Sequence, residues 1–190
     1  MYEVELKVRA DHEQVRDALA ARDADREHRV RQVDTYYDAP HRDFAETDEA
    51  LRTRLESDLE SGEETTELTY KGPLVETESK TREEHETVVD DPAGIEGILD
   101  GLGFEPAATV EKHREAFSID GYTVTLDTVE ALGEFVEVER AVAAADPDDP
   151  GVARVREGAI DLMGELGLDH DEQIRTSYLG LVLEAGAAGE

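Results

Sequence analysis

The sequence of 190 residues contains no cysteine and no tryptophan. Without cysteine the fold has neither disulfides nor thiolate metal sites, which agrees with a reducing compartment. No apolar stretch approaches the roughly 20 residues that a membrane helix needs, and no apolar run behind the N-terminus resembles a signal peptide. We therefore expect a cytoplasmic protein that does not act at a membrane.

Positive charge is also scarce, because 49 acidic residues stand against 19 Lys and Arg, for a formal net charge of −30. Such a surface repels polyanions, so nucleic acid is not an expected partner. Disorder could explain the acidity, but 38% hydrophobic residues, arranged in regular alternation, argue against it. We interpret the acidity as adaptation to a high-salt cytoplasm, where screening weakens repulsion between surface charges.

Strand-like alternation is the main pattern in the chain. Residues 3–9 alternate charged and apolar side chains, which is typical of a β-strand with one apolar face. The same reasoning predicts further strands at residues 30–38, 50–56, 64–71, 82–89, 109–119, 123–129 and 135–142. Helices are expected at residues 11–21, 92–102, 152–166 and 174–184, with Asp11 as the first N-cap and a polar linker at 146–150.

These elements predict an α+β fold with one domain over residues 1–185 and a flexible tail at 186–190. One face of each strand carries both positive and negative side chains. Burying such a face in a packed sheet would cost much free energy. A closed eight-stranded antiparallel β-barrel with a wet, charged interior solves this problem, because a barrel interior can hold a ligand.

The scarce cations lie at alternate positions of single strands. Three of the four lysines follow this rule, although the background is acidic. Salt bridges on a solvated sheet could explain any one strand, but not all of them together. The aligned residues are Glu3, Glu5, Lys7 and Arg9; Arg52 and Arg54; Thr69 and Lys71; Arg82, Glu84 and Glu86; Lys112 and Arg114; Asp127; and Glu137 and Glu139.

A triphosphate would explain this mixture of charges. It carries about four negative charges, which several Lys and Arg side chains can meet from different directions. Mg²⁺ or Mn²⁺ is held by a few carboxylates together with phosphate oxygens. The glutamate pairs Glu3/Glu5 and Glu137/Glu139 suit this role if the barrel brings them together.

The same residues also form the pattern of a known family. Residues 2–7 contain Glu-x-Glu-x-Lys, and the sequence resembles the CYTH family of triphosphate tunnel metalloenzymes across nearly its whole length. The resemblance is carried further by residues 32–38, 51–54, 69–73, 110–114 and 133–139.

The resemblance implies a tunnel that binds a triphosphate and a divalent metal. It implies that the metal ligands are Glu3, Glu5, Glu137 and Glu139, with Asp127 as a further candidate. It implies that the phosphates are bound by Lys7, Arg52, Arg54, Lys71, Lys112 and Arg114, and by Arg82 after a variable loop.

Two activities fit this resemblance. Residues 2–7 and 109–139 resemble class IV adenylyl cyclases, which convert ATP to cyclic AMP and pyrophosphate, and we favour this activity. Residues 34–38 with Arg52, Arg54 and Lys71 also resemble thiamine triphosphatases, in which Tyr36 and Lys71 would form a general base. The alternative is that Tyr36 is an aromatic residue of the barrel wall, and we favour this interpretation of Tyr36.

Three further possibilities remain open at this stage. The substrate of a hydrolase could be inorganic triphosphate. The domain could instead be a non-catalytic module that binds a triphosphate or polyphosphate. The C-terminal segment around residues 175–183 could pack on the barrel or form a homodimer.

The acidic composition gives the first testable prediction. Because salt screens repulsion among the acidic side chains, the unfolding temperature should rise markedly between dilute buffer and molar KCl. Differential scanning calorimetry at increasing KCl measures this directly. An unfolding temperature that does not change with salt would contradict the high-salt interpretation.

Overall fold

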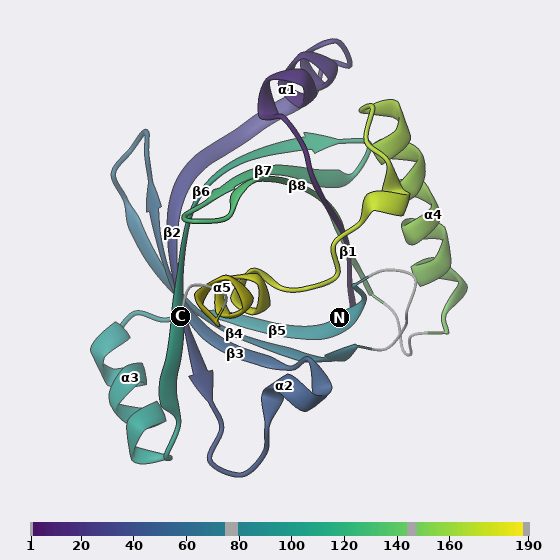
Figure 1. The fold of residues 1–190 in the computed structure, drawn as a ribbon. Helices are drawn as coiled ribbons and strands as arrows, with labels where there is room; N and C mark the ends of the chain where they lie inside the picture. The colour runs from purple at the N-terminus through teal and green to yellow at the C-terminus, as the bar shows by residue number, and fades with distance from the viewer. Residues whose placement is uncertain (1, 75–79, 144–147, 188–190) are drawn as a thin grey trace.

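The protein forms a closed antiparallel barrel, in agreement with the predicted fold (Figure 1). A computed structural model describes residues 2–74, 80–143 and 148–187. The strands follow one another around the barrel in the order β1-β5-β4-β3-β2-β6-β7-β8. They are β1 (Tyr2–Arg9), β2 (Asp25–Asp38), β3 (Ala50–Asp58), β4 (Glu64–Leu74), β5 (Arg82–Val88), β6 (Glu105–Ile119), β7 (Tyr122–Val129) and β8 (Gly133–Val142).

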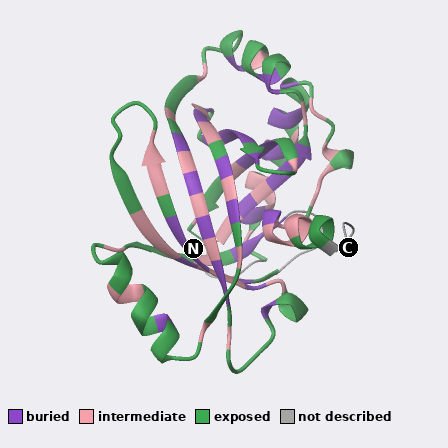
Figure 2. Cartoon of the chain, turned by 60° about the vertical axis from the view of Figure 1, so that its left-hand side comes forward, coloured by how far each residue is buried: buried purple, intermediate pink, exposed green. Residues whose placement is uncertain are grey.

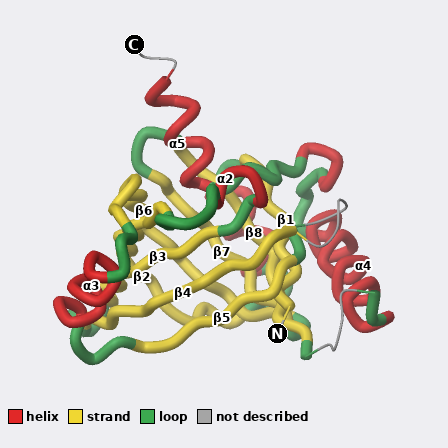
Figure 3. Tube along the Cα trace, turned by 90° about the horizontal axis from the view of Figure 1, so that it is seen from below, coloured by secondary structure: helices red, strands yellow, loops and turns green. Residues whose placement is uncertain are grey.

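Helices lie outside the barrel wall and at its end. The helices are α1 (His12–Ala20), α2 (Phe44–Thr47), α3 (Pro92–Gly101), α4 (Pro150–Glu165) and α5 (Tyr178–Ala187), with a 3₁₀ turn η1 (His170–Glu172). Figure 1 looks along the barrel and shows α5 across its opening, and Figure 3 shows α5 at one end of the barrel. No helix in the described ranges is both long and apolar enough to span a membrane.

The predicted boundaries need correction at several places. The segment 25–29 is charged and lacks apolar alternation, yet it pairs with β6 and extends β2. Pro150, which we assigned to a linker, begins α4, because the Asp149 side chain caps the helix. The last helix starts at Tyr178 instead of residue 174, and α2 and η1 were not predicted. Residues 146 and 147 of the expected linker and 188–190 of the expected tail lie outside the described residues.

One of the two hydrophobic clusters in the described part of the chain lies on the outside of the barrel wall. Leu6, Leu126 and Val136 point outward from β1, β7 and β8 and pack in one buried cluster with residues of α1 and α4, including Leu162. Along the strands buried and less buried residues alternate, as the bands of Figure 2 show. The charged residues that alternate with these apolar ones therefore face the barrel interior, among them Glu5 and Lys7 of β1 and Glu137 and Glu139 of β8.

One close contact fixes α4 against the barrel. The Tyr122 hydroxyl donates a hydrogen bond to the carbonyl oxygen of Val155, at 3.0 Å. This hydroxyl lies directly against Gly158, where a methyl group would overlap it. Gly158 therefore allows α4 to approach β7 closely.

Alanine substitutions in α4 test this contact. Gly158→Ala should lower the free energy of unfolding by about 1–3 kcal/mol, because the added methyl group displaces Tyr122. Gly164→Ala is the matched control, since no heavy atom lies within 4 Å of the position that its methyl group would take. That change should stabilise the helix by up to about 1 kcal/mol. Urea denaturation in KCl measures both, and equal effects at the two positions would contradict the proposed contact.

Candidate functional site

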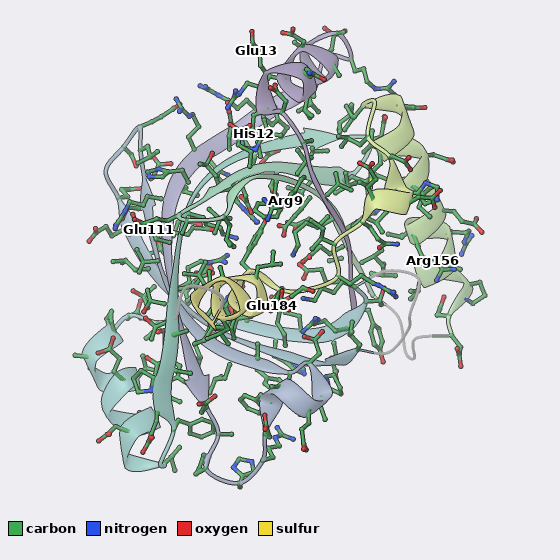
Figure 4. All side chains as sticks on the ribbon, viewed as in Figure 1. Arg9, His12, Glu13, Glu111, Arg156 and Glu184 are labelled. Carbon is green, nitrogen blue, oxygen red and sulfur yellow. The ribbon has the colours of Figure 1, made fainter. Side chains whose placement is uncertain are left out.

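A cavity of about 1190 Å³ runs into the barrel. Its wall is built from the inward faces of β1 to β6 and β8, and α2 and α5 lie at its edge. Figure 4 shows side chains filling the space inside the ring of strands, with α5, marked by Glu184, over the opening. A cavity of this size can enclose a small organic molecule.

Three carboxylates form one acidic group on the cavity wall. Glu5 on β1 lies opposite Glu139 on β8, and Glu137 is two residues away on the same inward face. One oxygen from each side chain lies within 4.8 Å of the others. This is the spacing that several oxygen ligands of one divalent cation require.

The protonation behaviour of the acidic group also fits a cation. Burial raises the pKa of Glu139 to about 8, and the nearby charges of Glu3 and Glu137 contribute to the rise. The pKa of Glu137 is held below its usual range, because Arg114 and Lys7 outweigh the effect of burial. A cation would relieve the repulsion among these carboxylates, and Mg²⁺ or Mn²⁺ would suit their oxygen ligands.

The other two predicted metal ligands are not among the three carboxylates whose oxygens converge. Glu3 forms an ion pair with Lys71 at 2.8 Å. Asp127 is completely buried and accepts two hydrogen bonds from Arg114, at 2.7 and 2.6 Å, so that it lies behind this arginine. A role of Glu3 or Asp127 in metal binding stays a prediction.

The predicted phosphate-binding residues all line the same cavity. They come from several strands, and most of them are buried below one tenth exposure. They are Lys7, Arg52, Arg54, Lys71, Arg82, Lys112 and Arg114. The alternation of these cations along their strands thus correctly indicated that they share a cavity.

Each of these cations is held by a carboxylate. Lys7 lies 3.4 Å from Glu5 and 3.5 Å from Glu137. Lys112 lies 3.4 Å from Asp127, which also orients Arg114. Burial lowers the pKa of Lys112 to about 8, and the positive charge of Arg114 adds to this shift.

Asp34 orients two of the arginines, and the sequence analysis did not assign it this role. It is 1% exposed on β2, and Arg54 donates to both of its oxygens, at 2.6 and 2.7 Å. Arg52 donates to it at 3.4 Å. Arg52 and Arg54 lower the pKa of Asp34 below its usual range in spite of its burial. Its position two residues before Tyr36, on the same face, was the available signal.

The two members of the predicted catalytic pair, Tyr36 and Lys71, interact with other groups. The Lys71 ammonium lies 2.8 Å from Glu3 and 2.8 Å from Glu84, and these carboxylates raise its pKa despite burial. Tyr36 packs in an apolar cluster with Val110 and Tyr178. No hydrogen bond joins Tyr36 to Lys71, both of which are in the described part of the chain.

Lys80 and Tyr178 are among the cavity residues that were not predicted as site residues. Lys80 is 7% exposed, and burial together with the charges of Lys7 and Arg82 lowers its pKa to about 8. The sequence did distinguish Lys80 in one respect, because it is one of only four lysines. Tyr178 lies against Lys7 and Lys112, but nothing in the sequence marked it, because its contacts depend on the path of the C-terminal segment.

Comparisons with known proteins agree with this geometry. A family model described as the CYTH domain matches residues 1–178. A protein of Methanocaldococcus jannaschii, provisionally named an adenylate cyclase, is 35% identical over 182 residues, which cover 95% of this chain and 98% of that protein. The solved structure of a Pyrococcus horikoshii protein is 37% identical, with a TM-score of 0.86 and coverage of 96% of this chain and 99% of that one.

A more distant structure extends the comparison. A Hippeastrum protein is 20% identical, with a TM-score of 0.65 and coverage of 97% of this chain and 95% of that one. It is described as a provisional adenylyl cyclase with a dominant triphosphatase activity. At this identity the likeness concerns the fold alone.

Asp34→Asn tests the buried arginine pairs. It removes the charge that Arg52 and Arg54 share, so the free energy of unfolding should fall by about 3–5 kcal/mol at neutral pH. The folded pKa of Asp34 lies below the ordinary value of about 3.9, so its stabilisation is complete above pH ~4 and is lost as the pH falls toward the folded pKa. The difference between variant and wild type should therefore shrink below pH ~4.

Urea denaturation at pH 7, 5 and 3, at constant KCl, measures this difference. Asp25→Asn, at an exposed position of the same strand, is the control and should change stability little. Equal stability of wild type and Asp34→Asn at pH 7 would show that the arginines do not depend on this carboxylate.

Proposed function

The chain belongs to the CYTH family, and from this membership and the geometry of the cavity we propose that it is a divalent-metal-dependent adenylate cyclase. It binds ATP in the barrel and converts it to cyclic AMP and pyrophosphate. The observation that carries the proposal is one cavity in which Glu5, Glu137 and Glu139 meet cations from several other strands.

The charges of this cavity suit a polyphosphate bound with a metal ion. An ion at the three carboxylates would neutralise phosphate charge and polarise the phosphate oxygens. Lys7 and Arg114 both contact Glu137, so a phosphate that approaches the acidic group also comes within reach of these two cations. Phosphoryl transfer needs mainly this kind of positioning and charge stabilisation, without a protein nucleophile.

Fixed arginines supply the rest of the proposed catalysis. Asp34 holds Arg54 in place and Asp127 holds Arg114, so neither guanidinium has to reorganise as charge develops on the leaving pyrophosphate. In the cyclase reaction the ribose 3′-hydroxyl loses its proton to the solvent, and its oxygen forms a bond to the α-phosphorus. The bond from this phosphorus to the oxygen that bridges to the β-phosphate breaks, and pyrophosphate leaves.

Support for the cyclase over the hydrolase comes from two directions. The relative from Methanocaldococcus jannaschii is provisionally named an adenylate cyclase, and it aligns over 95% of this chain. A Tyr36–Lys71 base would require Lys71 to leave Glu3 and Glu84, with which it forms short ion pairs.

Hydrolysis of inorganic or thiamine triphosphate is the second candidate. The Hippeastrum protein shares the fold and is described by its triphosphatase activity, and both reactions can use the same phosphate-binding walls. A non-catalytic binding module is the third candidate, but such a module has no need for a group of three converging carboxylates.

Product analysis tests the proposal. The protein is incubated in molar KCl with Mg²⁺ or Mn²⁺ and, separately, with ATP, tripolyphosphate and thiamine triphosphate, and the products are separated by chromatography. We expect cyclic AMP and pyrophosphate from ATP. Loss of an outer partner of a metal ligand typically reduces activity roughly 10- to 100-fold. Glu5→Gln and Lys71→Ala should each reduce activity by at least this factor.

Glu111→Gln is the matched control. It removes the same charge from β6, where Glu111 pairs with Arg31 away from the cavity, so activity should be retained. Orthophosphate without cyclic AMP would identify a triphosphatase. Tight binding of all three compounds without turnover would support the binding module and contradict enzymatic function.

A further inference from the structure

The hydroxyl group of Tyr178 is buried without a hydrogen-bond partner among the described residues. Three other tyrosine hydroxyls have partners: those of Tyr37, Tyr70 and Tyr122 interact with Thr53, Glu49 and Val155. Tyr178 itself is only 6% exposed. Because an unpaired buried hydroxyl costs free energy, native structures rarely keep one without a reason.

Tyr178 is placed among the groups that we expect to bind phosphate. It lines the cavity, and its ring centre lies 4.3 Å from the ammonium nitrogen of Lys7 and 4.9 Å from that of Lys112. Phe135 packs edge-on against the same ring, at 5.1 Å between centroids. The ring therefore covers one side of both ammonium groups and leaves a phosphate to approach them from the tunnel.

The backbone around Tyr178 is fixed to β1. The N–H of Ile174 donates to the carbonyl oxygen of Lys7 at 2.7 Å, which ties the segment to the residue whose side chain contacts the ring. Ser177 then starts α5, because its Oγ accepts from the N–H of Gly180 at 3.1 Å. Tyr178 is thus held at the tunnel by contacts on both sides of it in the sequence.

The hydroxyl keeps its proton in these surroundings. Burial raises the pKa of Tyr178, and the negative charges of Glu137 and Asp127 raise it further. A neutral tyrosine hydroxyl can both donate and accept a hydrogen bond. The lysines beside it can only donate. These lysines therefore leave the proton of the Tyr178 hydroxyl without an acceptor, and an acceptor on a bound ligand would complete the bond.

We propose that the Tyr178 hydroxyl donates a hydrogen bond to a phosphate oxygen of the bound triphosphate, so that α5 contributes a substrate-binding residue. The inference rests on the proposed function, because it requires a triphosphate at Lys7 and Lys112. An anionic oxygen is a stronger acceptor than a neutral one. Substrate binding would then complete a bond that the free protein lacks, and it would hold the start of α5 over the occupied tunnel.

Tyr178→Phe tests this proposal, because it removes the hydroxyl and keeps the ring. The probe is the bis-methylene analogue of tripolyphosphate with Mg²⁺, which neither cyclisation nor hydrolysis can cleave. Isothermal titration calorimetry should show a Kd roughly 10-fold higher or more for the variant. Its unfolding temperature without the probe should not fall, since the free protein loses no hydrogen bond.

Tyr122→Phe is the matched control and should behave in the opposite way. Its hydroxyl is bonded to Val155 on the outer side of the barrel, so the unfolding temperature should fall while the Kd stays unchanged. Wild-type affinity in Tyr178→Phe, or a loss of thermal stability as large as in Tyr122→Phe, would overturn the inference and leave the proposed function intact. Failure of the wild-type protein to bind the probe would contradict the proposed function itself.

Discussion

The pairing of buried opposite charges inside the barrel is the interaction on which the rest of the structure depends. The apolar faces of β1, β7 and β8 are used on the outside, where α1 and α4 cover them, so the charged faces must turn inward. A buried charge is tolerated only when it is paired and hydrogen-bonded. Asp34 meets this need for Arg52 and Arg54, and Asp127 meets it for Lys112 and Arg114.

These pairs also separate two kinds of carboxylate. Asp34 and Asp127 are each surrounded by cations, which keep them ionised and use their lone pairs. Glu5, Glu137 and Glu139 instead converge on one another, and repulsion within that group favours an added positive charge. In the barrel interior the charges of Asp34 and Asp127 are thus neutralised by neighbouring cations, whereas the acidic group attracts a cation.

The sequence was sufficient to predict the barrel and most of its charged lining, because strand alternation places Lys7, Lys112 and Arg114 on one face by geometry alone. It was insufficient for Asp34, because a position on the same strand face as Tyr36 does not mark one acid among 49 as the partner of buried arginines. The sequence also could not predict contacts between segments that are far apart in the chain. Tyr178 meets Lys7 across most of the chain, and residues 25–29 become strand only because β6 lies beside them.

The pairing of β1 with β8 has a consequence for how the protein folds. Glu5 pairs with Glu139 and Lys7 with Glu137, so the acidic group is assembled from the first and the last strand of the barrel. Contacts between such distant parts of a chain form late, because the loop between them must be closed first. The acidic group therefore exists only when β1 and β8 are paired, and a chain in which these two strands are apart has no site for an ion.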